Sequence, residues 1–189
     1  MAEKQLSGLK VAAVTTDGVE QVELLEPKKA LEEAGAQVLV VAPKAGKVQG
    51  FKHHDKADQI PVDLTLDQAD PADFDAVLLP GGVINADALR MEKKAQEIVR
   101  QIDRRGNPIA VICHGGWLLV SAGLTRGHIM TSWPTLQDDI RNSGAGWEDR
   151  EVIRDRNWVS SRKPDDIPAF NREVIKLFSE AVQKQRKVA

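Results

Sequence analysis

The chain has 189 residues, of which 42% are hydrophobic and 29% are charged, and its formal net charge at pH 7 is −2. This length and composition are typical of one ordinary globular domain, so we expect residues 1–189 to form a single domain. Basic and acidic residues are interspersed without a basic stripe, which argues against a nucleic-acid partner.

Three features bear on the compartment. The first eight residues are mainly polar and lack the apolar stretch of a signal peptide. No apolar run approaches the roughly 18 residues of a membrane span. A single cysteine cannot form an internal disulfide. We therefore expect a cytoplasmic protein that does not contact a membrane.

Apolar runs alternate with amphipathic segments along the chain, a pattern typical of a parallel sheet covered by helices on both faces. The fold class is therefore predicted to be α/β. The strongest predicted strands are residues 9–14, 38–41, 76–79 and 108–112. Weaker patterns predict short strands at 46–51, 60–64 and 128–130, and a hairpin that turns at 155–157.

The predicted helices lie between these strands. A short helical turn at 22–25 is expected to lead into a helix that Pro27 opens and Gly35 ends. A second helix is predicted from Ala86 or Glu92 to Arg105. Others are expected at 117–122, after Pro134, and from the hairpin to about residue 183.

Cys113 directly follows the predicted strand 108–112 and precedes a helical stretch. In open α/β sheets, catalytic groups gather beyond the carboxyl ends of the strands, and a nucleophile on a tight strand-to-helix turn projects into that crevice. The amides of the new helix are expected to favour the thiolate. The alternative is a small buried hydrophobe that ends an apolar run, but the position of Cys113 favours the nucleophile.

Backbone amides around this elbow are candidates for binding a developing oxyanion. They belong to His114 and Gly115 at the elbow itself, and to the turn formed by Gly81 and Gly82 after strand 76–79.

Two further side chains are candidates for the same edge of the sheet. His114 can act on Cys113 only if the elbow rotates it, because adjacent residues in a strand point to opposite faces. Glu20 follows the first strand and is either a solvated carboxylate or a partner of the sulfur. A protonated Glu20 would stabilise the thiolate, whereas a charged one would raise the pKa of Cys113.

The chain resembles the ThiJ/PfpI superfamily, most closely its PfpI-type intracellular proteases and deglycases of the general stress protein kind. The resemblance covers about residues 10–178 and depends on six stretches in the family's order: residues 20–24 (EQVEL), 75–82 (DAVLLPGG), 110–115 (AVICHG), 131–134 (TSWP), 138–139 (DD) and 157–162 (NWVSSR).

The resemblance implies a flavodoxin-like three-layer αβα sandwich, as in class I glutamine amidotransferases, and a homodimer that can build a hexamer. It implies that Cys113 is the nucleophile, His114 its base and Glu20 the protonated partner of the sulfur. The family pattern adds an acidic residue from a neighbouring subunit. Here Asp87 is the nearest acid, one residue out of place. Trp117 stands near the position where a proline often opens the helix, and is expected to shape the mouth of the pocket.

Other kinds of site are not indicated. His53 and His54 are adjacent in a polar stretch with no clear further ligands, so no metal site is expected. The turn after the first strand lacks a glycine-rich phosphate loop, so no nucleotide cofactor is expected. The late histidine of glutamine amidotransferases is missing, unless His128 serves.

The sequence thus predicts a cysteine hydrolase that acts on peptides, or on glyoxal and methylglyoxal adducts of proteins, in stress protection. A lactate-forming glyoxalase is a related possibility. The alternative from another class is a non-enzymatic redox sensor or chaperone-like stress protein that uses an oxidisable Cys113.

Overall fold

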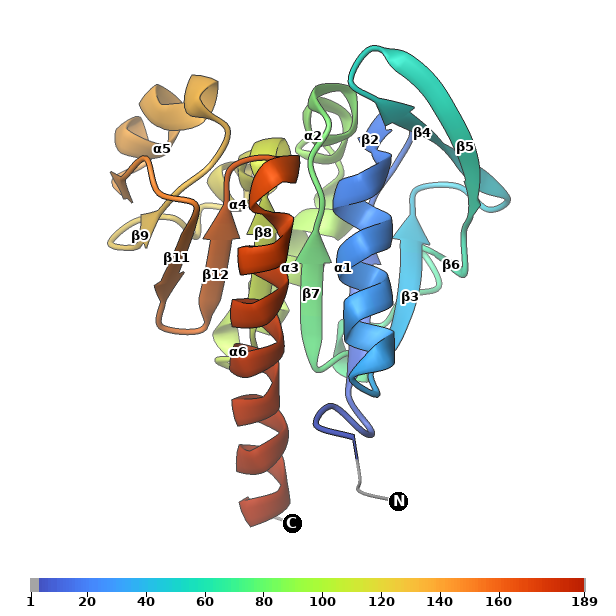
Figure 1. The fold of residues 1–189 in the computed structure, drawn as a ribbon, viewed down its shortest axis with the longest axis vertical. Coiled ribbons are helices and arrows are strands. Elements are labelled where there is room, and N and C mark those ends of the chain that lie inside the picture. Colours follow the sequence, from blue (N-terminus) through green and yellow to red (C-terminus); the bar gives the residue numbers. More distant parts are fainter. Residues whose placement is uncertain (1–3, 189) are drawn as a thin grey trace.

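The computed structural model describes residues 4–188 and is built on a seven-stranded sheet (Figure 1). The strand order is β11-β12-β8-β7-β1-β3-β6. Six strands are parallel, and β11 pairs antiparallel with β12 at one edge. The strands are β1 (Lys10–Val14), β3 (Gln37–Ala42), β6 (Leu64–Thr65), β7 (Ala76–Leu79), β8 (Ile109–Ile112), β11 (Val152–Asp155) and β12 (Trp158–Ser161).

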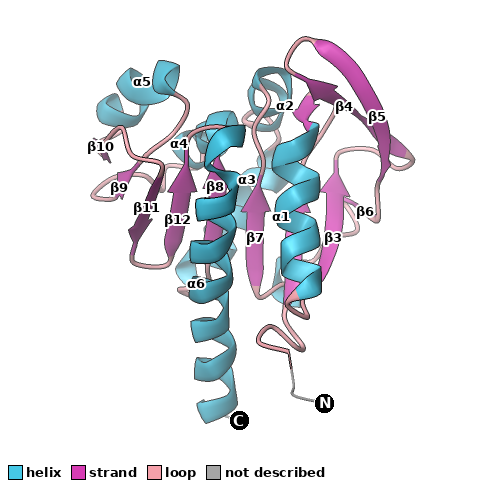
Figure 2. Cartoon of the chain, viewed as in Figure 1, coloured by secondary structure: helices cyan, strands magenta, loops and turns pink. Residues whose placement is uncertain are grey.

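Helices cover both faces of this sheet (Figure 2). On one face, α1 (Gln21–Glu33) and α6 (Ile167–Val188) pack on Val11 and Ala13, while α3 (Lys93–Arg104) and α4 (Gly116–Ser121) share the other core with Ala12 and Val14. The alternation along β1 is the period of two expected of a strand buried on both faces. The predicted three-layer α/β sandwich is therefore confirmed.

Smaller elements complete the fold. They are α2 (Val83–Leu89), α5 (Gln137–Asn142), a parallel pair made of β9 (Ile129–Met130) and β10 (Gly146–Trp147), and a second sheet made of β2 (Val19–Glu20), β4 (Lys47–Lys52) and β5 (Asp55–Pro61). Single 3-10 turns lie at Pro71–Asp73, Cys113–Gly115, Pro134–Leu136 and Pro164–Asp166.

The predicted start of the first helix is wrong. α1 begins at Gln21, and Pro27 lies inside it instead of opening it. Proline removes one helical N–H donor at this point, but burial of the inward face formed by Glu23, Leu24, Pro27 and Leu31 keeps the helix continuous. The shift matters for function because it places Glu23 in the first turn of a helix.

The predicted helix from Ala86 or Glu92 to Arg105 is two helices. α2 starts at Val83, directly after the double glycine, and α3 starts at Lys93. The predicted hairpin turn is confirmed, with Arg156 at a φ of 53° between β11 and β12.

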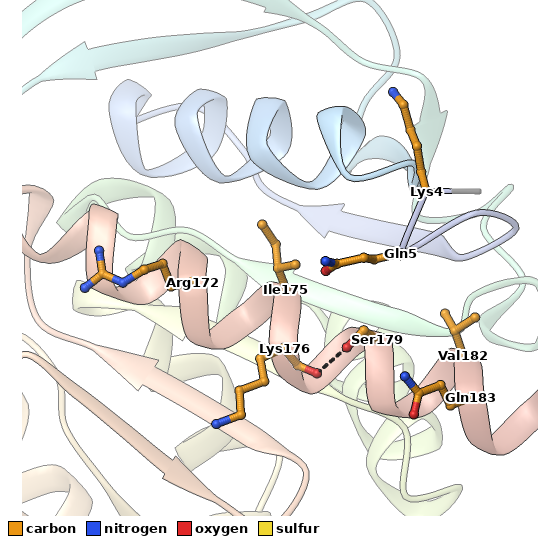
Figure 3. Close-up of a pocket in the computed structure, with 8 residues that line it drawn as sticks. All are labelled: Lys4, Gln5, Arg172, Ile175, Lys176, Ser179, Val182 and Gln183. Carbon is orange, nitrogen blue, oxygen red and sulfur yellow. Dashed lines mark hydrogen bonds between the residues drawn. The ribbon is translucent and has the colours of Figure 1, made fainter. Parts of the chain in front are cut away.

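The carboxyl ends of the neighbouring strands β1, β7 and β8 lie side by side, at the top in Figure 1. A pocket of about 430 Å³ lies away from these strand ends, between α6 and the segment before β1 (Figure 3). Lys4, Gln5 and Ile175 line that pocket, and none of the predicted site residues does. Within residues 4–188, no helix is long and apolar enough to cross a membrane, and no group of His, Cys, Asp or Glu side chains could hold a metal ion.

Candidate active site

Cys113 occupies a sharp turn between β8 and α4. Its φ is 60°, in the left-handed region that non-glycine residues rarely adopt, and it opens the 3-10 turn Cys113–Gly115. A residue in this region costs about 1–3 kcal/mol, so the surrounding structure must hold it there. The residue is buried, with 7% of its surface exposed. The predicted strand-to-helix elbow is therefore present, and it bends the chain sharply at the cysteine.

The elbow brings His114 to the sulfur. His114 Nδ1 lies 3.2 Å from Cys113 Sγ, which a regular strand would not allow. Burial lowers the pKa of His114 below its ordinary value, so the imidazole is neutral at neutral pH. A neutral ring nitrogen at this distance can accept the thiol proton.

Glu23 is the carboxyl that interacts with the sulfur. Its side chain is fully buried, and its Oε2 accepts a hydrogen bond from the Gly81 N–H at 2.9 Å. Burial, helped by the charge of Glu20 nearby, raises the pKa of Glu23 to about 8, while its hydrogen bond with the Cys113 side chain acts in the opposite direction. The carboxyl is therefore protonated at neutral pH and can donate a hydrogen bond to sulfur.

Glu20 does not take the position predicted for it. Its carboxylate accepts a hydrogen bond from the backbone N–H of His53 at 2.9 Å, on the β4–β5 hairpin. It also lines a pocket of about 330 Å³ that neither Cys113 nor His114 lines. The prediction chose the wrong glutamate of the EQVEL stretch, because Glu20 lies just before α1 and Glu23 lies on the inward face of that helix. The helical spacing of Glu23, Leu24, Pro27 and Leu31 was the signal that could have identified it.

The state of the sulfur also differs from the prediction. Burial raises the pKa of the Cys113 thiol and so does the charge of Glu23 when ionised, whereas the backbone N–H groups of His114 and Gly82 lower it. The amides at the elbow act in the predicted direction, but burial outweighs them. The resting site therefore favours a thiol that needs a base, and His114 is the base within reach.

The double-glycine turn packs directly against the elbow. A Cβ on Gly115 would lie 2.6 Å from the Leu79 carbonyl oxygen, and one on Gly82 would lie 2.3 Å from the Gly18 carbonyl oxygen. Such distances exclude any larger residue without movement of the backbone. The Gly81 N–H, predicted to bind an oxyanion, is instead taken by Glu23. Hydrogen bonding from the backbone N–H groups of His114 and Gly82 lowers the pKa of the Cys113 thiol.

Two tryptophans flank His114. The Trp117 ring meets the imidazole edge-on at 5.4 Å between centroids, and the Trp133 ring stacks on it at 6.0 Å. Trp117 Nε1–H donates to Asp139 Oδ2 at 2.8 Å, which fixes the ring. The Arg90 guanidinium lies 5.2 Å from the centroid of the Trp117 ring. The contribution of Trp133 was not predicted.

Asp87 lies on the exposed face of α2, next to the exposed side chains of Val83 and Ile84. No hydrogen bond or ion pair joins Asp87 to His114 within the described part of the chain. A catalytic role for Asp87 would therefore require a second copy of the chain.

Comparisons with known proteins show which family the chain belongs to. The model of the DJ-1/PfpI family matches residues 9–177. A protein named deglycase from Thermococcus kodakarensis is 43% identical over 90% of this chain and 99% of its own length. A protein named putative cysteine protease from Bacillus subtilis is 38% identical over 89% of this chain and 98% of its own.

The crystal structure of Drosophila melanogaster DJ-1beta superposes with a TM-score of 0.82 at 27% sequence identity, covering 95% of this chain and 96% of that one. The family model, which matches residues 9–177, includes the whole seven-stranded sheet and the elbow at Cys113. The chain belongs to the DJ-1/PfpI family.

Proposed function

We propose that the protein is a cysteine hydrolase that removes glyoxal and methylglyoxal adducts from protein amino groups, with peptides as a second substrate class. The observation that carries this proposal is the contact of one sulfur with two groups in complementary protonation states. His114 is neutral and can accept a proton, and Glu23 is protonated and can donate a hydrogen bond.

The first step is displacement of the amine. Cys113 Sγ forms a bond to the adduct carbon as the carbon–nitrogen bond breaks, and the thiol proton passes through His114 to the leaving amine. Glu23 O–H stabilises the charge on sulfur as it develops, and the N–H groups of Gly82, His114 and Gly115 are the donors available to an oxyanion.

The second step regenerates the enzyme. For a methylglyoxal adduct, a proton shift between the two former carbonyl carbons turns the sulfur-bound hemithioacetal into a thioester, and one water then releases lactate and restores the thiol. For a peptide, attack on the carbonyl gives the thioester directly. One water is consumed in each case, and no external oxidant or reductant is needed.

The relatives support an enzyme of this kind, since those named above are a deglycase and a putative cysteine protease. The same names favour an enzyme over a redox sensor, because neither describes a sensing protein. For the stress-protective role, substrate removal is therefore favoured over oxidation of Cys113.

We further propose that the active form is a homodimer, with hexamers built from dimers, in which Asp87 of one copy approaches His114 of another. The exposed Val83 and Ile84 beside Asp87 give α2 an apolar surface that a second copy would cover. A carboxylate next to the imidazole would stabilise its protonated form after it accepts the thiol proton.

The test uses a peptide whose lysine has been treated with methylglyoxal, and it measures free amine and lactate together. The wild-type protein is expected to release both in equal amounts. The variants Cys113→Ala and Glu23→Leu are expected to lose at least about a hundredfold and tenfold in rate, respectively. Equal release by Cys113→Ala would exclude the proposed function.

A further inference from the structure

Asn85 is a fully buried amide in the first turn of α2, and every hydrogen bond it can make is used. Its Oδ1 accepts from the Thr16 N–H at 2.7 Å and from the Thr15 hydroxyl at 3.2 Å. Its Nδ2 donates to the carbonyl oxygens of Pro80 at 3.1 Å and Gly81 at 2.9 Å. One side chain thus joins the turn after β1 to the turn after β7.

The two carbonyls that Asn85 holds belong to the two peptide planes of the double-glycine turn, which packs against the elbow at Cys113. The Pro80 carbonyl shares a plane with the Gly81 N–H, which donates to Glu23 Oε2 at 2.9 Å. The Gly81 carbonyl shares a plane with the Gly82 N–H, a backbone donor that lowers the pKa of the Cys113 thiol. In a trans peptide, fixing the oxygen fixes the direction of the opposite N–H.

We propose that Asn85 is the positioning residue of the active site: by holding both peptide oxygens it aims the Gly81 N–H at Glu23 and the Gly82 N–H at Cys113. The inference rests on the proposed function for its consequence in catalysis. Asn85 touches neither the sulfur nor the groups that react with it, so it acts through the turn alone.

The chemistry of the position explains why an amide is needed. Two donors must face the carbonyl oxygens while an acceptor faces the Thr16 N–H and the Thr15 hydroxyl. Position 81 has to be glycine, because a Cβ there would lie 2.4 Å from Glu23 Oε2 and 2.6 Å from the Cys113 Cβ. Glycine has no side chain that could fix the orientation of the peptide planes on either side of it. The turn that serves the site therefore has to be fixed from outside.

The test compares two variants of this contact with a matched change elsewhere. Asn85→Asp keeps the shape and loses the donors, and Thr15→Val removes one hydrogen bond to Asn85 Oδ1. Asn157→Asp is the control, because Asn157 Nδ2 also donates to two oxygens, Asp103 Oδ1 at 3.1 Å and the Asn107 carbonyl at 2.8 Å, at the opposite edge of the sheet.

The main readout is the rate at which iodoacetamide alkylates native Cys113 at neutral pH, measured with the thermal unfolding midpoint of each variant. Asn85→Asp is expected to slow alkylation at least about tenfold and Thr15→Val about two- to threefold, because the Gly82 N–H no longer lowers the pKa of the thiol fully. Asn157→Asp is expected to lower the midpoint but leave the alkylation rate within about twofold of wild type.

Unchanged or faster alkylation in folded Asn85→Asp would overturn the proposal, and so would equal slowing by Asn157→Asp. If Asn85→Asp does not fold, Thr15→Val decides the matter, and a wild-type rate in that variant is the contradicting result. Alkylation requires no turnover, so a failed deglycase assay with wild-type protein would count against the proposed function and leave this test intact.

Discussion

Replacing Glu23 with glutamine should remove a specific pH dependence from the stability of the protein. The glutamine keeps an oxygen for the Gly81 N–H, so the change removes the titrating proton and little else. In the wild type, burial raises the pKa of Glu23 from its ordinary value of 4.5 to about 8. Below about pH 4.5 the carboxyl is protonated in both the folded and the unfolded chain, and no pH dependence arises from it.

Between those two values the folded chain retains a proton that the unfolded chain releases, so the free energy of unfolding falls as pH rises. The fall is about 1.4 kcal/mol per pH unit, or on the order of 5 kcal/mol over the whole interval. This contribution is fully present below about pH 4.5 and is lost as pH rises through about 8.

The assay is urea unfolding followed by circular dichroism at several pH values across that interval. The difference between wild type and Glu23→Gln isolates the contribution of Glu23, because the other titrating groups are common to both. Glu20→Gln is the matched control and should retain most of the slope, since Glu20 only adds to the rise in the pKa of Glu23. A difference curve that stays flat within about 1 kcal/mol would refute the assignment of Glu23 as the buried, protonated carboxyl.

Three further changes test other parts of the site. Gly115→Ala should destabilise the fold by about 2 kcal/mol or more and abolish turnover, because its Cβ would lie 2.6 Å from the Leu79 carbonyl oxygen; urea unfolding and the amine-release assay measure both effects. His114→Gln should lower the turnover rate at least about a hundredfold, because it removes the proposed base. In the wild type, burial lowers the pKa of His114, so the activity that depends on the neutral imidazole should persist below pH 6.5. Asp139→Asn should weaken the acceptor of the Trp117 indole N–H and raise KM with a smaller change in kcat; unchanged kinetics would show that the orientation of this ring is unimportant.

The fold was largely predictable because its main strands are short apolar runs that end shortly before Thr15, Pro43, Pro80 and Cys113. These runs follow directly from burial on both faces of a parallel sheet. The start of α1 was not predictable in the same way, since a proline favours a first helical turn and only tertiary packing keeps the helix continuous through Pro27.

The site residues that directly follow a strand could be predicted from the sequence. Cys113, His114 and the double glycine follow strands whose ends meet at one edge, so their proximity follows from topology. Glu20 was predicted because it follows the first strand, whereas Glu23 reaches the site only because α1 begins at Gln21 and turns Glu23 inward.

Two other features depended on long-range contacts. The pKa of Cys113 reflects how deeply the elbow is buried, which the local sequence does not encode. The role of Asn85 depends on contacts with carbonyls and a threonine pair that converge only in the folded chain.

The most direct test of the central claim uses the wild-type protein alone, because the sequence contains a single cysteine. Iodoacetamide is added in steps, the alkylated fraction of Cys113 is read by intact-protein mass spectrometry, and amine release from the methylglyoxal-treated peptide is measured at each step. We predict that activity declines in proportion to alkylation and reaches zero when every sulfur is modified. Residual activity in fully alkylated protein would contradict the assignment of Cys113 as the nucleophile.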